Sequence, residues 1–308
     1  MIVTLTLNPT VDTSTTVDRL AADHKLRCAS PRYDAGGGGI NVSKAISRLG
    51  GHSLALFTSG GAMGLMLQNL VEKEGIEHQI IGIEGLTREN FIVTETSTNH
   101  QFRFGMPGPT LTPGETDACL AALENLPARP DYIVASGSLP PGIADEFYAM
   151  VARRAKKLNA RFILDTSGEP LKAAANEGVF LLKPNLGELS RMAGVETLEM
   201  SDVDDAAMEI INRGDCEVVV VSLGPGGAML VTKDTYEHVH TPTVRKQSTV
   251  GAGDSMVGGM VYALSQGQSF SEMVRLGVAC GTAATMNPGT QLFKKPDVDR
   301  LLNWINNH

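Results

Sequence analysis

The chain has 308 residues, 42% of them hydrophobic, and a formal net charge of −8 at pH 7. A chain of this length can bury a large core, and it fits one broad α/β domain over residues 1–308 better than a repeat array. The negative charge and the lack of a basic run exclude a general attraction to nucleic acid or to an anionic membrane.

The cysteines and the N-terminus indicate the cellular compartment. Cys28, Cys119, Cys216 and Cys280 lie far apart without a CxxC pair, which argues against a zinc site or a disulfide framework. The apolar run 2–7 lacks the length and the basic flank of a signal peptide or a membrane span. We therefore expect a cytoplasmic protein.

Strand-like apolar runs recur along the chain, and most are separated by segments with helical periodicity. The runs cover residues 2–7, 53–57, 132–135, 162–164, 180–182 and 218–222. This alternation predicts an α/β fold with a mostly parallel sheet and helices on both faces. Ligands of such folds gather beyond the carboxyl ends of the strands, where this chain has glycine-rich and polar clusters.

Two β-rich segments, residues 13–34 and 76–104, interrupt the alternation because their short strands leave no room for helices. We interpret them as a small inserted sheet, a lid that would keep water from a transferring phosphate; an ordinary edge hairpin is the alternative. Because such a sheet has a face to cover, we expect a homodimer that pairs through the lid.

Candidate substrate-binding residues follow the first strand. Asp12 lies near its carboxyl end and is a candidate acceptor for substrate hydroxyls. Four glycines, Gly36 to Gly39, precede Asn41 and the helical pattern 42–49. They would let a ligand approach the backbone, with Asn41 bonding a sugar hydroxyl, but a hinge between lid and core is an equally open interpretation.

Four cations lie on the two lid segments, with Lys25 and Arg27 on the first and Arg88 and Arg103 on the second. A phosphate already present on the substrate would explain this grouping. The alternative for each is an ordinary solvated side chain.

Residues 183–188, Lys-Pro-Asn-Leu-Gly-Glu, follow a strand and begin a helix. Asn185 and Glu188 lie on one helical face and would suit hydrated Mg²⁺, which needs only one or two protein oxygens. The same pair matches a helix capping box, and both interpretations stay open. The later turn 222–227 suits a nucleotide or a plain hairpin.

The most informative segment is 249–255, Thr-Val-Gly-Ala-Gly-Asp-Ser, which opens the helical run 254–264. Gly251, Ala252 and Gly253 let successive N–H groups turn toward one point, and the helix N-terminus adds partial positive charge, so a phosphate would fit there. Asp254 stands where a general base is needed, although an acid that only complements the helix dipole is the alternative. GxxxxGK[ST] is absent and no GxGxxG follows the first strand, which argues against a P-loop or a classical dinucleotide fold.

In this order, the motifs resemble those of the ribokinase-like (PfkB) sugar kinases over essentially the full chain. They are Gly36 to Asn41, Ser136-Gly137-Ser138, Asp165, Lys183 to Asn185 with Glu188, Ser222 to Gly224 and Thr249 to Asp254. The resemblance implies a three-layer α/β/α sandwich with a small β lid. Segments 26–28, 36–42, 136–142 and 247–258 look most like the bacterial 6-phosphofructokinases of this family, which implies ATP-dependent phosphorylation of fructose 6-phosphate to fructose 1,6-bisphosphate in glycolysis.

The resemblance also implies roles for individual residues. Asp254 would deprotonate the sugar hydroxyl, Gly251 to Gly253 would stabilise the transferring phosphoryl group, and Asn185 with Glu188 would organise Mg²⁺ on ATP. The sugar would contact Asp12, Gly37, Gly38, Asn41 and Ser138, its phosphate Lys25, Arg27, Arg88 and Arg103, and the nucleotide Lys183, Asn185, Ser222, Gly224 and Ser248. A monovalent cation, K⁺, would bind at Ser248, Val250, Ala284, Asn287, Gly289 and Gln291.

Other functions share these motifs. The 1-phosphofructokinases commonly have Lys where this chain has Gly38, which favours the 6-phosphate over them, and tagatose-6-phosphate kinases are the second alternative. A sugar-phosphate or nucleotide sensor without turnover is an alternative from another class. Asp254 and the complete glycine cradle argue against it, because a sensor needs no base at the attack position.

Overall fold

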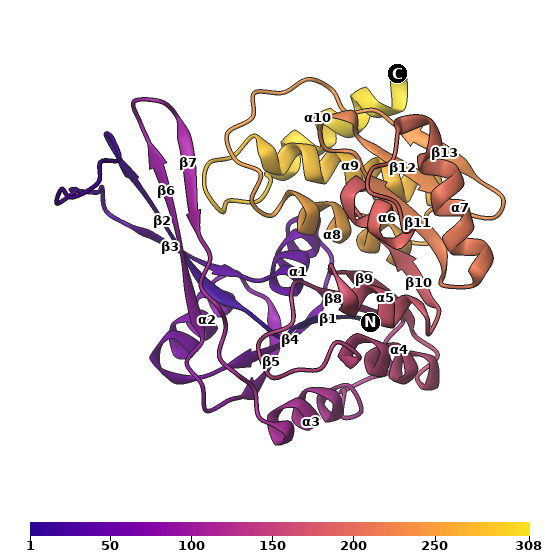
Figure 1. Ribbon diagram of the computed structural model, residues 1–308, viewed down its shortest axis with the longest axis horizontal. Helices are drawn as coiled ribbons and strands as arrows, with labels where there is room; N and C mark the ends of the chain where they lie inside the picture. Colours follow the sequence, from indigo (N-terminus) through magenta and orange to yellow (C-terminus); the bar gives the residue numbers. More distant parts are fainter.

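The computed structural model describes residues 1–308 and contains a large and a small sheet (Figure 1). The large sheet has nine strands in the order β13-β12-β11-β10-β9-β8-β1-β4-β5. Their bounds are β1 Ile2–Thr6, β4 Leu54–Ser59, β5 Glu77–Gly82, β8 Tyr132–Ser136, β9 Arg161–Asp165, β10 Val179–Leu182, β11 Cys216–Ser222, β12 Ala228–Val231 and β13 Tyr236–Val239. Only the pairs β11–β12 and β12–β13 are antiparallel, so the predicted mostly parallel sheet is confirmed.

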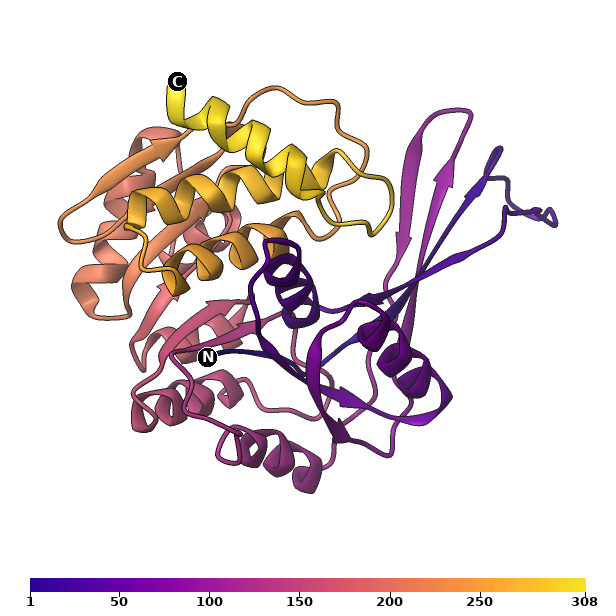
Figure 2. The same cartoon turned by 180° about the vertical axis from the view of Figure 1, so that it is seen from behind.

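Helices cover both faces of this sheet (Figures 1 and 2). One face carries α3 Pro113–Ala122, α4 Phe147–Lys157, α5 Glu169–Ala175, α6 Leu186–Met192 and α7 Val203–Arg213. The other carries α1 Gly38–Arg48, α2 Gly61–Lys73, α8 Ala252–Ser265, α9 Phe270–Thr285 and α10 Lys295–Asn307. The three-layer α/β/α sandwich is thus confirmed. None of these helices is long and apolar enough to cross a membrane.

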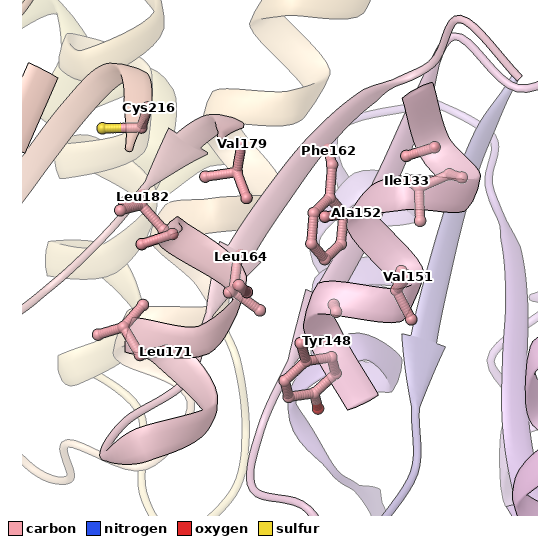
Figure 3. Close-up of a cluster of buried hydrophobic side chains, with 14 of the residues drawn as sticks. Ile133, Tyr148, Val151, Ala152, Phe162, Leu164, Leu171, Val179, Leu182 and Cys216 are labelled. Carbon is pink, nitrogen blue, oxygen red and sulfur yellow. The ribbon is translucent and has the colours of Figure 1, made fainter. Parts of the chain in front are cut away.

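The core follows from the alternation of side chains along each strand. In β11, Val219 and Val221 pack on one face of the sheet, whereas Val218 and Val220 pack on the other. Figure 3 shows part of the first cluster, in which Tyr148 and Val151 of α4 lie with Phe162 of β9. Because both faces are covered, the central strands read as nearly continuous apolar runs.

The chain reverses its direction of travel across the sheet between β1 and β8. From β1 it moves outward to β4 and β5, and from β8 outward the other way to β9, β10 and β11. The carboxyl ends of β1 and β8 therefore flank a topological switch point, where open α/β sheets have a crevice for ligands.

The small sheet has the order β3-β2-β6-β7 and projects from the body (Figure 1). Its strands are β2 Thr10–Val17, β3 Arg32–Gly36, β6 Arg88–Glu95 and β7 His100–Phe104. The predicted segment 76–104 began too early, because β5 pairs with β4 in the large sheet. Strand periodicity does not say which sheet edge a strand joins, and the free edge of β4 takes β5.

Candidate active site

Asp254 lies in the first turn of α8, where the sequence predicts it, and receives two hydrogen bonds. Asn41 Nδ2, from α1, donates to Asp254 Oδ2 over 2.9 Å. Ser136 Oγ, at the end of β8, donates to Asp254 Oδ1 over 3.1 Å. The fold therefore brings three distant segments together at the switch point, and it fixes the direction of the carboxylate.

The surroundings of Asp254 make it a stronger base than an ordinary aspartate. Burial raises its pKa to about 6, and the nearby Asp165 carboxylate acts in the same direction. The hydrogen bonds from Asn41 and Ser136 and the charge of Lys183 oppose this rise. A carboxylate with such a pKa is ionised at neutral pH and well placed to take a proton.

Lys183 brings positive charge to the glycine cradle. Its Nζ lies 3.1 Å from Asp165 Oδ1, and only 6% of the side chain is exposed. Burial lowers the pKa of Lys183, but the charge and hydrogen bond of Asp165, together with the charges of Glu188 and Asp254, leave that pKa raised, so the ammonium group stays charged. A β-carbon built at Gly253 would lie 3.6 Å from Lys183 Nζ, so the lysine borders the predicted phosphate position.

The cradle and the first glycine run both need glycine for steric reasons. Gly251, the N-cap of α8, has φ 71°, and a β-carbon there would lie 2.5 Å from Leu292 Cδ2. The helix predicted from residue 42 begins earlier, at Gly38, since Gly38 and Gly39 pack directly on the strand ends. A β-carbon at Gly38 would meet Ser136 Oγ at 2.3 Å. Gly37, with φ 114°, is the turn into this helix.

The base of the small sheet, beside the carboxyl end of β1, presents Asp12 and Arg88. Asn90 Nδ2 donates to Asp12 Oδ1 over 3.2 Å, and burial raises the pKa of Asp12 to about 6. The terminal nitrogens of Arg88 donate to the carbonyls of Asn8 at 2.8 Å and Met106 at 3.0 Å. Its Nε is buried without a partner in the protein, as expected of a group that awaits an acceptor from a ligand.

Sequence reasoning missed Asn90 as a site residue. It lies two positions after Arg88 on β6 and pairs with Asp12 of β2. Residues two apart on a strand lie on the same face of the sheet. The prediction of Arg88 as a site residue therefore also indicated Asn90. The sequence places Ser136 in a motif, but its contact with Asp254 depends on the tertiary structure.

The other predicted cations lie farther along the small sheet than Arg88. Arg103 of β7 donates from Nη2 to Thr249 Oγ1 over 2.8 Å, so it contacts the loop before the glycine cradle. Lys25 and Arg27 are exposed in the loop between β2 and β3, at the tip of the small sheet (Figure 1). Ser138 lies beside the segment that follows β1, where its Oγ accepts a hydrogen bond from Asn8 Nδ2 at 3.3 Å.

Four of the five predicted nucleotide residues lie just after or at the ends of β10 and β11, namely Lys183, Asn185, Ser222 and Gly224. Asn185 Oδ1 accepts from Glu188 N, and Glu188 Oε2 accepts from Asn185 N, both at 2.9 Å, so the capping box is present. Glu188 Oε1 accepts no hydrogen bond from the protein, and this oxygen fits a water-mediated Mg²⁺ site. Ser222 forms a β-bridge with Asn185, and Gly224, with φ 58°, opens the turn between β11 and β12.

The residues predicted to bind a monovalent cation lie on the loop before α8 and on the last turn of α9 with the loop that follows it, and these two segments meet. The backbone N–H of Ser248 donates to the carbonyl of Thr285 at 3.3 Å, which joins the loop before α8 to the end of α9. The carbonyls of Ser248, Val250, Asn287, Gly289 and Gln291 accept no hydrogen bond within the protein. The carbonyl of Ala284 accepts only from Asn287 N, at 3.2 Å, and Gln291 N donates to Pro288. Unpaired carbonyl oxygens are suitable ligands for K⁺.

Comparisons with known proteins agree with this geometry. Residues 5–297 match the family described as pfkB family carbohydrate kinase. The chain is 44% identical to the ATP-dependent 6-phosphofructokinase isozyme 2 of Mycobacterium tuberculosis over 97% of this chain and 88% of that protein. It is 42% identical to the isozyme 2 of Escherichia coli over 99% and 98% of the two chains. The crystal structure of phosphofructokinase-2 from Escherichia coli in complex with potassium covers 99% of each chain with a TM-score of 0.95 and 41% identity. The predicted family is thereby confirmed, and the chain belongs to the pfkB family of carbohydrate kinases.

Proposed function

We propose that this carbohydrate kinase transfers the γ-phosphoryl group of ATP to fructose 6-phosphate. Asp254 takes the proton of the sugar C1 hydroxyl, whose oxygen attacks the γ-phosphorus in line while the bond to the ADP oxygen breaks. The observation that carries the proposal is the placement of Asp254 beside the glycine cradle, with Asp12 and Arg88 at the base of the small sheet beside the carboxyl end of β1. Residues 1–308 then act as one kinase domain, with the small sheet as its lid.

On the nucleotide side, the N–H groups of Gly251 to Gly253 and the Lys183 ammonium stabilise the charge that develops on the transferring phosphoryl group. Ser222, Gly224 and Ser248 border the nucleotide. Asn185 and Glu188 would hold Mg²⁺ through water, and the ion, when bound, neutralises phosphate charge on ATP. K⁺ would bind the unpaired carbonyls of the loops 248–250 and 284–291, which agrees with the potassium complex of the Escherichia coli relative.

On the sugar side, Asp12, Asn41, Gly37 and Ser138 are placed to contact hydroxyls, and Arg88 to contact the phosphate. Gly38 supports fructose 6-phosphate over fructose 1-phosphate, because a β-carbon there would lie 2.3 Å from Ser136 Oγ and leaves no room for the lysine common in 1-phosphofructokinases. Tagatose 6-phosphate differs in stereochemistry, and a displacement on the order of 1 Å is enough to change productive geometry.

The test is ADP release with Mg-ATP and KCl against fructose 6-phosphate, fructose 1-phosphate, tagatose 6-phosphate and fructose. We expect the highest kcat/KM with fructose 6-phosphate. A higher value for another sugar would overturn the substrate, and no turnover with any of them would favour a non-catalytic sensor.

The two site carboxylates predict an acid limb in the pH profile. The pKa values of Asp12 and Asp254 are raised to about 6, so kcat/KM for fructose 6-phosphate should fall as the pH drops through 6, with a slope above one proton. Because the Asp165 carboxylate raises the pKa of Asp254, Asp165→Asn should move part of this limb to lower pH. Initial rates measured from pH 5 to 8, on protein shown by circular dichroism to be folded, test the predicted acid limb. A kcat/KM that does not change with pH contradicts it.

A homodimer through the lid is part of the proposal. Alternation places Asp12, Asn90 and Arg103 on the face of the small sheet toward the site, and leaves an aromatic face on the other side. That face consists of the exposed side chains Tyr33, Phe91, Phe102 and Phe104. Exposed aromatic groups on a small sheet are typical of an interface.

Phe91→Asp should therefore give a monomer in sedimentation velocity, because a charge at the centre of the aromatic face opposes its burial. Tyr236→Asp, on the edge strand β13, is the matched control, since Tyr236 is also an exposed aromatic residue but lies outside the small sheet. An unchanged sedimentation coefficient for Phe91→Asp would rule out pairing through this face.

A cytoplasmic location completes the proposal. All four cysteines are free thiols, three buried and one, Cys28, exposed. An exposed free thiol is compatible with a reducing compartment, in which thiols are kept reduced. Fractionation of growing cells, with detection of the protein by an antibody, would test the location. Recovery of the protein in an exported fraction would contradict it.

A further inference from the structure

Thr290 connects the loop after α9 with the lid. Its Oγ1 donates to Asp34 Oδ2 over 2.6 Å, and both residues are buried, with 4% and 6% of their surface exposed. Asp34 lies on β3 and also receives hydrogen bonds from Arg32, at 2.9 Å from Nε and 2.9 Å from Nη2. Neither the proposed chemistry nor the predicted site residues account for this contact.

On the lid side, Asp34 is directly linked to the sugar site. It pairs with Asp12 across the β2–β3 ladder. The same loop also lies close to β2, since a β-carbon built at Gly289 would lie 3.5 Å from Ser14 Cβ and Oγ. Thr290 therefore contacts β3, and its neighbour Gly289 lies beside β2, the strand that carries Asp12.

On the loop side, Thr290 stands between two of the predicted monovalent-cation residues, Gly289 and Gln291. The Gly289 carbonyl belongs to the peptide unit that also contains Thr290 N. A fixed Thr290 side chain therefore restricts the direction in which this unpaired carbonyl points.

We infer that the Thr290–Asp34 hydrogen bond is a positioning contact through which cation binding at the loop and sugar-phosphate binding at Asp12 strengthen each other. The inference rests on the proposed function, because it takes fructose 6-phosphate as the sugar and the 248–291 carbonyls as the cation site. Two sites joined by such a contact must affect each other equally, since coupling between binding sites is reciprocal.

Removing the Thr290 hydroxyl should break this link without unfolding the lid. Asp34 keeps its hydrogen bonds to Arg32, so its carboxylate is not left unpaired. Lys44, buried in α1, also continues to hold β3 through a 3.1 Å hydrogen bond to the carbonyl of Ala35. Thr290→Val keeps the shape of the side chain and deletes only the donor.

The experiment is calorimetric titration of fructose 6-phosphate, without ATP, in KCl and in tetramethylammonium chloride of equal ionic strength. For the natural chain we expect a Kd at least about fivefold lower in KCl. For Thr290→Val the two Kd values should agree within about twofold, and Thr290→Ser, which restores the hydroxyl, should recover the difference. Thr232→Val, which removes a buried threonine hydroxyl between β12 and β13, is the control and should keep the full difference.

Three results would overturn the inference. The first is that the natural chain has the same Kd for fructose 6-phosphate in both salts. The second is that Thr290→Val keeps the full difference between the two Kd values. The third is that both Kd values of Thr290→Val rise by the same factor, which marks a purely structural role. If Thr290→Val does not fold, Asp34→Asn tests the same link and should also reduce the difference. Failure of the proposed function is distinct, because it would appear as binding of fructose 6-phosphate without its phosphorylation.

Discussion

Asp254→Asn is expected to lower kcat by at least about 10²-fold while ATP still binds, because the proton acceptor is lost and the anion cradle is kept. Asparagine has the same shape, and its side chain can still accept the hydrogen bond from Asn41 while the Ser136 hydroxyl rotates to accept from its amide. The N–H groups of Gly251 to Gly253 do not change. Rapid-quench measurement of the transfer step, with calorimetry of ATP binding, checks both parts.

The same substitution should stabilise the fold at neutral pH. The pKa of Asp254 is raised from 3.8 to about 6, so ionised Asp254 destabilises the folded state above pH 6, and this cost disappears as the pH falls toward 4. Asparagine removes a cost on the order of 1–3 kcal/mol, which should appear as a higher Tm at pH 7.5 and a smaller difference near pH 4.

Asp299→Asn is the control for this substitution, because Asp299 is exposed and pairs only with Lys295 at the surface. It should leave kcat and Tm nearly unchanged. Near-natural turnover of Asp254→Asn would remove Asp254 from the role of base. A lower Tm would instead mean that its two hydrogen bonds outweigh the cost of its burial.

Arg88→Ala should raise KM for fructose 6-phosphate by about 10- to 100-fold and change KM for ATP by less than about threefold. Hydrogen bonds to the carbonyls of Asn8 and Met106 hold the guanidinium in place, and its buried Nε has no partner in the protein. A charge-assisted hydrogen bond to the sugar phosphate would be lost, whereas the nucleotide side of the crevice is untouched.

Two further variants separate charge from geometry at this position. Arg88→Lys keeps the charge without the planar donor fork, so its KM should lie between those of the natural chain and Arg88→Ala. Arg129→Ala is the control, since the Arg129 side chain binds only the carbonyl of Leu158 at an exposed site. Steady-state rates with each substrate varied in turn decide the matter: equal changes in both KM values would move Arg88 out of the sugar site.

The sequence by itself predicted the central strands and the phosphate cradle because both are local. Strands buried on two faces read as apolar runs, as in 132–135 and 218–222, and helices separated them visibly. The cradle consists of consecutive residues at one helix N-terminus, so Gly251 to Asp254 carry their geometry within four positions. The spacing of 185 and 188 likewise indicated the capping box as one of two open interpretations.

Only the tertiary structure decided which distant residues meet. Asn41, Ser136 and Asp254 converge because β1 and β8 are neighbours in the sheet, and no local pattern states that order. For the same reason β5 joined the large sheet, Arg103 reached Thr249, and the Thr290–Asp34 contact could not be foreseen. Periodicity records which face of its own element a residue occupies, but the partner of that face is chosen by the packing of the whole chain.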